Sequence, residues 1–280
     1  MLFRSVHLKA MLCKPLLHLL DGVGVFQGGK LLHLCGEFLP GTLINGDGLF
    51  HQHHVKLYAP VVDLLVEMVF LPQKIDVYKR QDYGVPQKRE RVFFIGIRGD
   101  SFDEKRLHQL ITHHKTKAAP IRDILLPLGK AGSEENPRTC VAKINFCARP
   151  VMRKSPYAGM YFNGQGRPID IDGYANTLPA SMGGNKTPFI DEDYLYGEAD
   201  DNFIENYHKG LMDGSIIPEY KEAPSRLRRI TIREAAKIQT FPDDYIFCGK
   251  PAAIYKQIGN AVPCKMAEAV ASAVAEYLQA

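Results

Sequence analysis

The cysteines of this chain lack any spacing that is typical of a metal or redox site. Six cysteines occur among 280 residues, and no two of them stand in a C-x-x-C arrangement, which argues against the common zinc and dithiol motifs. A chain of this length can build a hydrophobic core and does not need disulfides to fold. We therefore expect reduced thiols and a cytoplasmic protein.

Long apolar runs are missing as well. A membrane-spanning helix needs a run of about 18 or more apolar residues, and the sequence contains none. The first twenty residues do combine a basic residue with an apolar stretch, but Lys14, Pro15 and His18 interrupt it, which disfavours a secretion signal. We expect no membrane partner.

Histidine is concentrated in one part of the chain. Six of the ten histidines lie in residues 1–80, where acidic residues are few. The group His51, His53 and His54 has no cysteine or carboxylate beside it, so we interpret it as a polar loop and expect no metal site.

What the chain does contain is enough apolar residue to fold. Hydrophobic residues make up 45% and charged residues 24%, which is typical of one large or two small globular domains. The formal net charge of +4 is compatible with a nucleic-acid partner but does not by itself indicate one.

Two helices are predicted near the C-terminus. Thr231 and Glu234 form a capping box, in which the hydroxyl and the carboxylate each accept a backbone N–H at the helix start, and Pro242 ends this helix nearby. A second helix should begin at Pro263, because proline suits the first helical position. Apolar residues recur along it at steps of three and four: Met266, Val270, Val274 and Tyr277.

A glycine-led turn is predicted between these helices at residues 259–262. Such a turn leaves backbone N–H groups free to face a ligand. The order of residues here resembles the last two motifs of the DNA (cytosine-5-)-methyltransferase family, R-x-L-T-x-R-E-A-x-x-x-Q-x-F-P and Q-x-G-N-x-V-P. The matching residues are Arg228, Ile230, Thr231, Arg233, Glu234, Gln239, Phe241, Pro242, Gln257, Gly259, Asn260, Val262 and Pro263.

This resemblance implies an α/β fold: a partial Rossmann-like S-adenosylmethionine-dependent methyltransferase sheet with a smaller, irregular target-recognition domain. It implies S-adenosylmethionine as cofactor, in a site that this chain carries only in part. The residues implied to bind the cofactor are Asn260, Ala261 and Val262, and those implied to have structural roles are Gln87, Arg228, Arg233 and Glu234.

Three polar residues alternate ahead of an apolar run. Side chains of Gln87, Arg89 and Arg91 would project to one side of an extended backbone, and the run Val92–Ile97 that follows predicts a buried strand. The pattern resembles the family's Q-x-R-x-R motif, which implies catalytic roles for Arg89 and Arg91 beside a flipped cytosine and its phosphate. Arginine suits this place because its planar fork offers two donors. A solvated basic strand end is the alternative interpretation.

Residues 149–190 interleave cations and aromatics on glycine turns, a composition that favours a nucleic-acid surface. By resemblance this is the family's target-recognition region, in which polar side chains read base edges. The residues implied are Thr177, Leu178, Ser181, Asn185 and Lys186. A glycine-rich turn that serves packing alone is the alternative. We expect the acidic stretch 191–201 to face solvent.

Three motifs of a complete family member are not found in this chain: the F-x-G-x-G-G cofactor loop, the Pro-Cys loop that carries the nucleophile, and the Glu-Asn-Val stretch. The sole Pro-Cys pair, Pro263-Cys264, belongs to the terminal helix, so we interpret Cys264 as a packed thiol. Without a nucleophile, covalent activation of the base has no substitute, and we expect the chain alone to be inactive.

The domain organisation follows from these motifs. We interpret residues 1–80 as foreign to the family, through a fusion, a frame error or an assembly join near Asp76–Gln81. Residues 82–98 and 226–280 would belong to the catalytic domain, and residues 99–225 to target recognition.

The predicted function is that of the C-terminal portion of a DNA (cytosine-5-)-methyltransferase, acting on double-stranded DNA within a restriction–modification system. Two alternatives stay open. The chain is one half of a split enzyme, whose partner chain supplies the N-terminal catalytic half, or it is a stand-alone DNA-recognition module.

Overall fold

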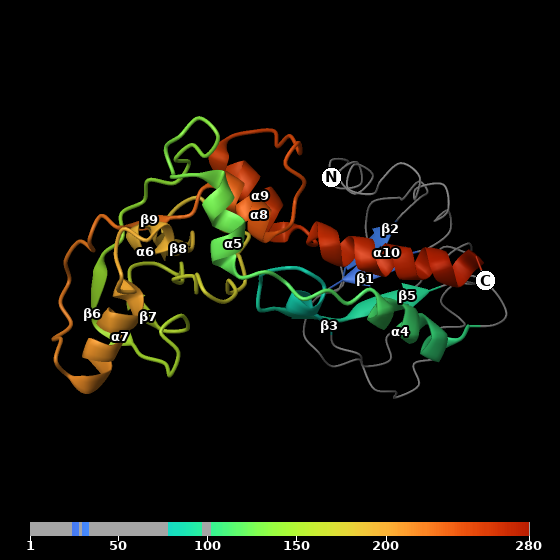
Figure 1. The fold of residues 1–280 in the computed structure, drawn as a ribbon, viewed down its shortest axis with the longest axis horizontal. Coiled ribbons are helices and arrows are strands. Elements are labelled where there is room, and N and C mark those ends of the chain that lie inside the picture. The colour runs from blue at the N-terminus through green and yellow to red at the C-terminus, as the bar shows by residue number, and fades with distance from the viewer. Residues whose placement is uncertain (1–23, 28–29, 34–77, 97–101, 280) are drawn as a thin grey trace, which may run out of the picture. The chain divides into compact units, whose positions relative to one another are not determined.

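The computed structural model describes residues 24–27, 30–33, 78–96 and 102–279 (Figure 1). The chain divides into two compact units. The first unit comprises residues 1–79, 90–114 and 268–280, and the second comprises residues 80–89 and 115–267. The prediction that concerns residues 51–54 lies outside the described residues.

The first unit contains a small antiparallel sheet. Its strand order is β2 (Lys30–His33), β1 (Gly24–Gln27) and β5 (Phe93–Gly96), and Gly24 pairs with both His33 and Gly96. The strand predicted over Val92–Ile97 is thus confirmed from Phe93 to Gly96. A second antiparallel pair joins β3 (Tyr78–Lys79) to β4 (Glu90–Arg91).

Tyr277 joins two helices within the first unit. Helix α4 (Glu104–His113) begins after Asp103, whose carboxylate accepts the N–H of Arg106 at 3.0 Å. Near the end of α10 (Cys264–Gln279), the Tyr277 hydroxyl accepts the N–H of Asp103 at 2.7 Å, and the Arg106 guanidinium lies 5.3 Å from its ring centroid. The C-terminal part of α10 is therefore held to α4 by polar and cation–π contacts.

The second unit consists of short helices and two-stranded sheets (Figure 1). Strand β6 (Phe146–Val151) pairs antiparallel with β7 (Met160–Phe162), and β8 (Phe189–Asp191) with β9 (Leu227–Arg229). The α-helices are α5 (Ile121–Leu125), α6 (Glu192–Tyr196), α7 (Phe203–Asp213), α8 (Ile232–Ile238), α9 (Pro251–Asn260) and the first residues of α10. Two 3₁₀ turns cover Arg80–Asp82 and Leu126–Leu128.

The helices predicted near the C-terminus are confirmed. Helix α8 carries the complete capping box of Thr231 and Glu234, and α10 begins directly after Pro263 with the apolar residues Met266 and Val270 buried. The described residues form a mixed α/β structure with small sheets, as expected. None of the described helices is both long enough and apolar enough to span a membrane.

An aromatic core fills the second unit between β6, β7, β8 and α7. Phe162 lies at its centre, with ring centroids of Phe146, Tyr161, Phe189 and Tyr207 between 4.8 and 5.7 Å away. The cluster corrects the expectation of a surface where aromatics alternate with cations. Tyr157, Tyr161 and Phe162 of that segment are buried, because rings of this size contribute most when they are removed from water.

Replacement of Phe162 by alanine should destabilise the second unit strongly. The side chain is buried among four other rings, and loss of such a phenylalanine costs about 3 to 5 kcal/mol in free energy of unfolding. Urea denaturation followed by tyrosine fluorescence measures the change. Val141, which is 85% exposed, provides the control, since Val141→Ala should leave the unfolding midpoint almost unchanged; equal effects of the two substitutions would contradict this core.

Candidate functional site

A polar loop at residues 181–187 closes around a buried threonine. The Thr187 hydroxyl accepts the N–H of Gly183 at 2.8 Å, and the Thr187 N–H donates to the Gly184 carbonyl at 2.9 Å. Ser181, Asn185 and Lys186 are exposed on this loop. The loop therefore presents two hydrogen-bonding side chains and one cation to solvent from a fixed backbone.

The neighbouring Thr-Leu pair divides between surface and core. Thr177 is exposed, whereas Leu178 is only 1% exposed. The prediction that Leu178 takes part in recognition is therefore corrected for its side chain, which packs inside the unit because burial of a leucine is strongly favourable. Leu178 can still fix the position of the backbone that leads into the loop.

Helix α9 lies directly against this loop. A Cβ on Gly259 would lie 2.5 Å from the Pro179 carbonyl oxygen and 2.7 Å from Ala180 Cα, and one on Gly183 would lie 3.1 Å from Ala252 Cα. Gly183 also has φ +113°, a value that favours glycine. Both glycines thus permit a close approach between the helix and the chain around residues 179–183.

This packing corrects the turn predicted at residues 259–262. Gly259 and Asn260 are the last residues of α9, and Gly259 has no positive φ. The N–H groups at the start of α10 have partners too: Cys264 donates to the Gln239 carbonyl at 3.3 Å, and Lys265 donates to the Thr240 hydroxyl at 3.1 Å. Contrary to the expectation from the sequence, these two N–H groups are not free to face a ligand. Gly259 serves packing.

Thr240 has an unusual conformation that this arrangement explains. Its φ is 59°, a left-handed value that is costly for a β-branched residue. Thr240 N–H donates to the Lys237 carbonyl and Phe241 N–H to the Ala236 carbonyl, the bond pattern that ends a helix with a left-handed residue. Glycine would be favoured by conformation alone, but it lacks the side-chain oxygen with which Thr240 accepts the Lys265 N–H at the start of α10.

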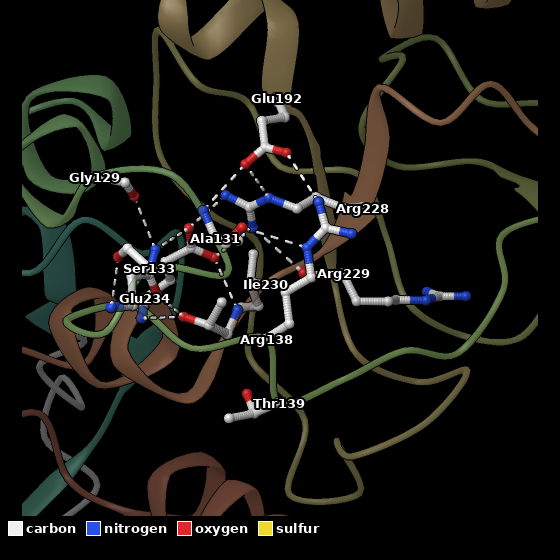
Figure 2. A network of polar contacts seen from close by, with 12 residues as sticks. Gly129, Ala131, Ser133, Arg138, Thr139, Glu192, Arg228, Arg229, Ile230 and Glu234 are labelled. Carbon is white, nitrogen blue, oxygen red and sulfur yellow. Dashed lines mark hydrogen bonds and ion pairs between the residues drawn. The ribbon is translucent and has the colours of Figure 1, made fainter.

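A buried ion pair joins β9 to the helices α6 and α8 (Figure 2). Arg228 of β9 donates to both carboxylate oxygens of Glu234 at 2.8 and 2.7 Å and to Glu192 at 2.6 Å. Arg228 is 7% exposed and Glu234 is fully buried. Burial alone lowers the pKa of Arg228, but hydrogen bonds and charge from Glu234 and Glu192 outweigh it and raise this pKa.

Glu234 and Asn136 extend the network beyond this pair. Glu234 accepts the Thr231 N–H at 2.8 Å, and the Thr231 hydroxyl donates to the Asn136 side chain at 2.5 Å. Asn136 also donates to the Gly129 carbonyl at 3.0 Å. The network ties β9, α6, α8 and the loop at residues 129–138 together. The acidic stretch expected in solvent therefore starts with two buried groups, Asp191 and the largely buried Glu192.

Gln87 and Arg89 of the Q-x-R-x-R motif lie in the second unit. Gln87 is buried, its side chain accepts from Arg80, and Arg80 also donates to Gln239 at 3.3 Å. Arg89 is half-buried. Arg80 thus connects Gln87 and Gln239, which stand far apart in the chain.

Arg91 belongs to the first unit, where it ends β4. It is half-buried, burial lowers its pKa, and its guanidinium donates to the Glu90 carbonyl at 2.7 Å. Arg233 of the second unit is also partly exposed, and it donates to the Asp243 carbonyl at 2.9 Å.

The residues implied for the cofactor lie at the end of α9 and in the segment that leads to α10. Asn260 is exposed, and Ala261 and Val262 are half-buried. One exposed amide thus stands beside two partly exposed apolar side chains. Elsewhere among the described residues, one group of three potential metal ligands has its ligand atoms within 4.8 Å of one another: His113, His114 and Glu276. The His114 ring is already hydrogen-bonded to Glu276 at 2.9 Å.

A family model described as "C-5 cytosine-specific DNA methylase" matches residues 43–276. The chain belongs to this family. The family consists of transferases that act on cytosine in DNA, and the resemblance stated from the motifs is confirmed. The matched range begins within residues 1–80.

Relatives of this family member include type II methyltransferases. The chain is 28% identical over 283 residues to M.PspPI of Psychrobacter sp. (strain TA137), covering 93% of the chain and 59% of that protein. It is 29% identical over 242 residues to M.MthTI of Methanothermobacter thermautotrophicus, covering 84% of the chain and 65% of that protein. The chain thus spans less than two thirds of the length of these relatives.

Among solved structures, the S. pombe Dnmt2 methyltransferase is similar with a TM-score of 0.43 and 15% identity, over 73% of this chain and 57% of that one. The structure of an Entamoeba histolytica methyltransferase, EhMeth, is similar with a TM-score of 0.41 and 16% identity, over 73% of this chain and 52% of that one.

Several residues of this site had no signal in the sequence. Arg80, Asn136 and Glu192 each act through contacts with residues far away in the chain, and no short motif marks them. Helix α9 was missed as well. Pro251 at its first position and its apolar spacing were signals that could have found it.

Glu234→Gln should destabilise the second unit. Glutamine keeps the capping box, since it can accept the same N–H, but it removes a charge from the buried pair. Loss of one partner of such a pair costs about 3 to 5 kcal/mol in free energy of unfolding, measured by denaturant titration. Glu198→Gln removes a carboxylate from an exposed pair with Lys130 and should change little; a comparable loss in this control would contradict the assignment.

Gly259→Ala should separate the loop from α9. The new methyl group would overlap the backbone at Pro179 and Ala180, and overpacking of this kind costs about 1 to 3 kcal/mol. Gly184→Ala is the matched control, because a Cβ there meets nothing within 4 Å. Thermal unfolding of both variants provides the measurement. A Gly259→Ala protein as stable as the control would show that the close approach does not exist.

Proposed function

We propose that this chain is the C-terminal portion of a DNA (cytosine-5-)-methyltransferase of a restriction–modification system. The reaction is transfer of a methyl group from S-adenosylmethionine to C5 of cytosine in a specific duplex sequence. The observation that carries the proposal is the loop at residues 181–187, which exposes polar side chains and packs on α9, the helix that ends in the Gly259-Asn260 motif.

The loop supplies sequence recognition in this proposal. Amide and hydroxyl groups such as those of Asn185 and Ser181 hydrogen-bond base edges in the major groove, and the Lys186 ammonium contacts a phosphate or a base acceptor. Thr177 is exposed beside the loop and adds a hydroxyl. The fixed backbone around Thr187 supports this role, because a preorganised loop loses less entropy on binding.

Arg89 and Arg91 hold the target base once it leaves the stack. Cytosine is reached only after extrusion from the duplex, and a guanidinium can bind its carbonyl and the flanking phosphate together. S-adenosylmethionine supplies the methyl group when bound, with Asn260, Ala261 and Val262 lining one side of its site.

The nucleophile is not supplied by a recognised motif of this chain. Its Pro-Cys pair stands at the start of α10, with Cys264 as the first helical residue and its N–H bonded to Gln239. We therefore propose that the chain alone does not methylate DNA and that a partner chain completes the site. The division into residues 82–98 with 226–280 and residues 99–225 belongs to the same proposal, whereas the family match from residue 43 argues against a foreign origin of residues 43–80.

A second candidate is a DNA-recognition module without its own catalysis. The loop, α9 and the Arg228 network all lie within residues 80–89 and 115–267, so this unit contains every described contact that orders the loop. That arrangement favours DNA binding as a property that this unit possesses by itself.

Two assays on the full chain test the proposal. Tritium transfer from labelled S-adenosylmethionine to mixed-sequence duplex DNA should not exceed a no-protein control. Fluorescence anisotropy should show salt-dependent DNA binding, and Lys186→Ala should lower the slope of log K against log salt by about one. Lys209→Ala on α7 is the control and should leave the slope unchanged. Tritium incorporation would refute the lack of activity, and absence of binding would refute recognition by this chain.

A further inference from the structure

Arg229 is a buried arginine whose guanidinium takes no part in the Arg228 network, although its backbone carbonyl accepts from Arg228 at 3.4 Å. Figure 2 shows its side chain extending away from the Arg228 guanidinium, as expected for consecutive residues of a strand. Arg229 is 3% exposed. Its guanidinium donates to the Thr187 carbonyl at 2.6 Å and to the Asn163 side chain at 3.3 Å, and it lies 5.5 Å from the Phe189 ring centroid.

The charge of Arg229 is not balanced by a carboxylate. Among the ion pairs of the described residues none involves Arg229, and its Nε has no hydrogen-bond partner. Burial lowers its pKa. A buried cation without a counter-charge destabilises a fold, so packing alone does not explain arginine at this position. The two acceptors of Arg229 explain the presence of an arginine better. One is the Thr187 carbonyl of the loop, and the other is the Asn163 side chain of the turn beside it.

The Thr187 carbonyl is the point through which Arg229 acts. Thr187 closes the loop at residues 181–187 with its hydroxyl and its N–H. A donor that binds the Thr187 carbonyl therefore fixes the position of the loop. Gly166 makes room for this contact, since a Cβ there would overlap the Thr187 carbonyl and approach the Arg229 guanidinium to 2.5 Å. Gly166 N–H also donates to the Asn185 carbonyl at 3.1 Å.

We propose that Arg229 is a positioning residue for DNA sequence recognition, which holds Asn185 and Lys186 in one orientation through the Thr187 carbonyl. The inference rests on the proposed function. Arg229 itself does not contact DNA, because its side chain is buried. Its removal should therefore relax the choice of sequence more than it weakens the binding of DNA in general. Arg229 stands at the variable position of R-x-L-T, so the family motif does not assign it this role.

Lysine should replace Arg229 poorly. The planar guanidinium reaches two acceptors with separate N–H groups in a fixed geometry, whereas an ammonium is a compact point charge on a flexible stem. A role that requires only positive charge would tolerate Arg229→Lys. A positioning role would not, and this difference separates the two explanations.

Hydrogen exchange followed by mass spectrometry tests the loop in the full chain. In Arg229→Met and Arg229→Lys, amides of residues 183–187 should exchange about tenfold faster than in the wild type, since a bond from a charged donor is lost. Exchange in α7 should not change. Arg138→Met, which removes an arginine with a 59% exposed side chain, is the matched control. Unchanged exchange at residues 183–187 in the Arg229→Lys protein, which keeps the charge, would overturn the proposal.

Selection from a randomised duplex library tests specificity. The wild type should enrich one motif. The Arg229→Lys protein should bind bulk duplex DNA with an affinity within about threefold of the wild type. Its ratio of affinity for the motif to affinity for scrambled duplex should fall about tenfold, which is the loss that one mismatched base pair in the site causes. Equal ratios would refute the specificity role. If the wild type enriches no motif, the proposed recognition fails, while faster exchange in the same variants would still establish that Arg229 holds the loop.

Discussion

The bidentate contact between Arg228 and Glu234 is the constraint on which the second unit depends. Both groups are almost fully removed from water, and each is costly to bury without the other. Their geometry therefore dictates where β9 and α8 lie. Glu192 and Asn136 bind to the same pair, so the loop at residues 129–138 and helix α6 take their positions from it as well.

The two arginines of β9 divide two tasks between the faces of one strand. Arg228 has two carboxylates and stabilises the scaffold. Arg229 has only neutral acceptors and touches the loop at Thr187 and the turn at Asn163. Because successive side chains of a strand point to opposite sides, a rigid ionic cluster on one face fixes the backbone from which the other guanidinium reaches the loop. The Arg228 ion pairs thus fix the backbone of β9, and Arg229 in turn fixes the Thr187 carbonyl of the loop.

The local parts of this fold could be predicted from the sequence, and the long-range parts could not. The capping box at Thr231, the apolar face of α10 and the strand after Val92 follow from rules that act within a few residues, and the structure contains all three. The burial of Tyr161 and Phe162 was missed, because aromatic residues that alternate with cations in the sequence indicate an exposed surface. Their contacts with Tyr207 of α7, which bury them, are visible only in the structure. Arg80 and Glu192 were missed because their partners Gln239 and Arg228 stand far away in the sequence.

The Gly259-Asn260 motif shows how a correct family resemblance can still give an incomplete physical reason. The sequence alone, with a glycine shortly before a helix, predicts a turn that exposes N–H groups to a ligand. In this chain Gly259 lies inside α9, where the absence of Cβ lets the helix approach Ala180. The N–H groups that a ligand would need are bonded to Gln239 and Thr240. Thr240 adopts its left-handed conformation in making that bond. Since a strained residue persists only where its surroundings determine it, the junction of α8, α9 and the first residues of α10 fixes the surface against which residues 179–183 pack.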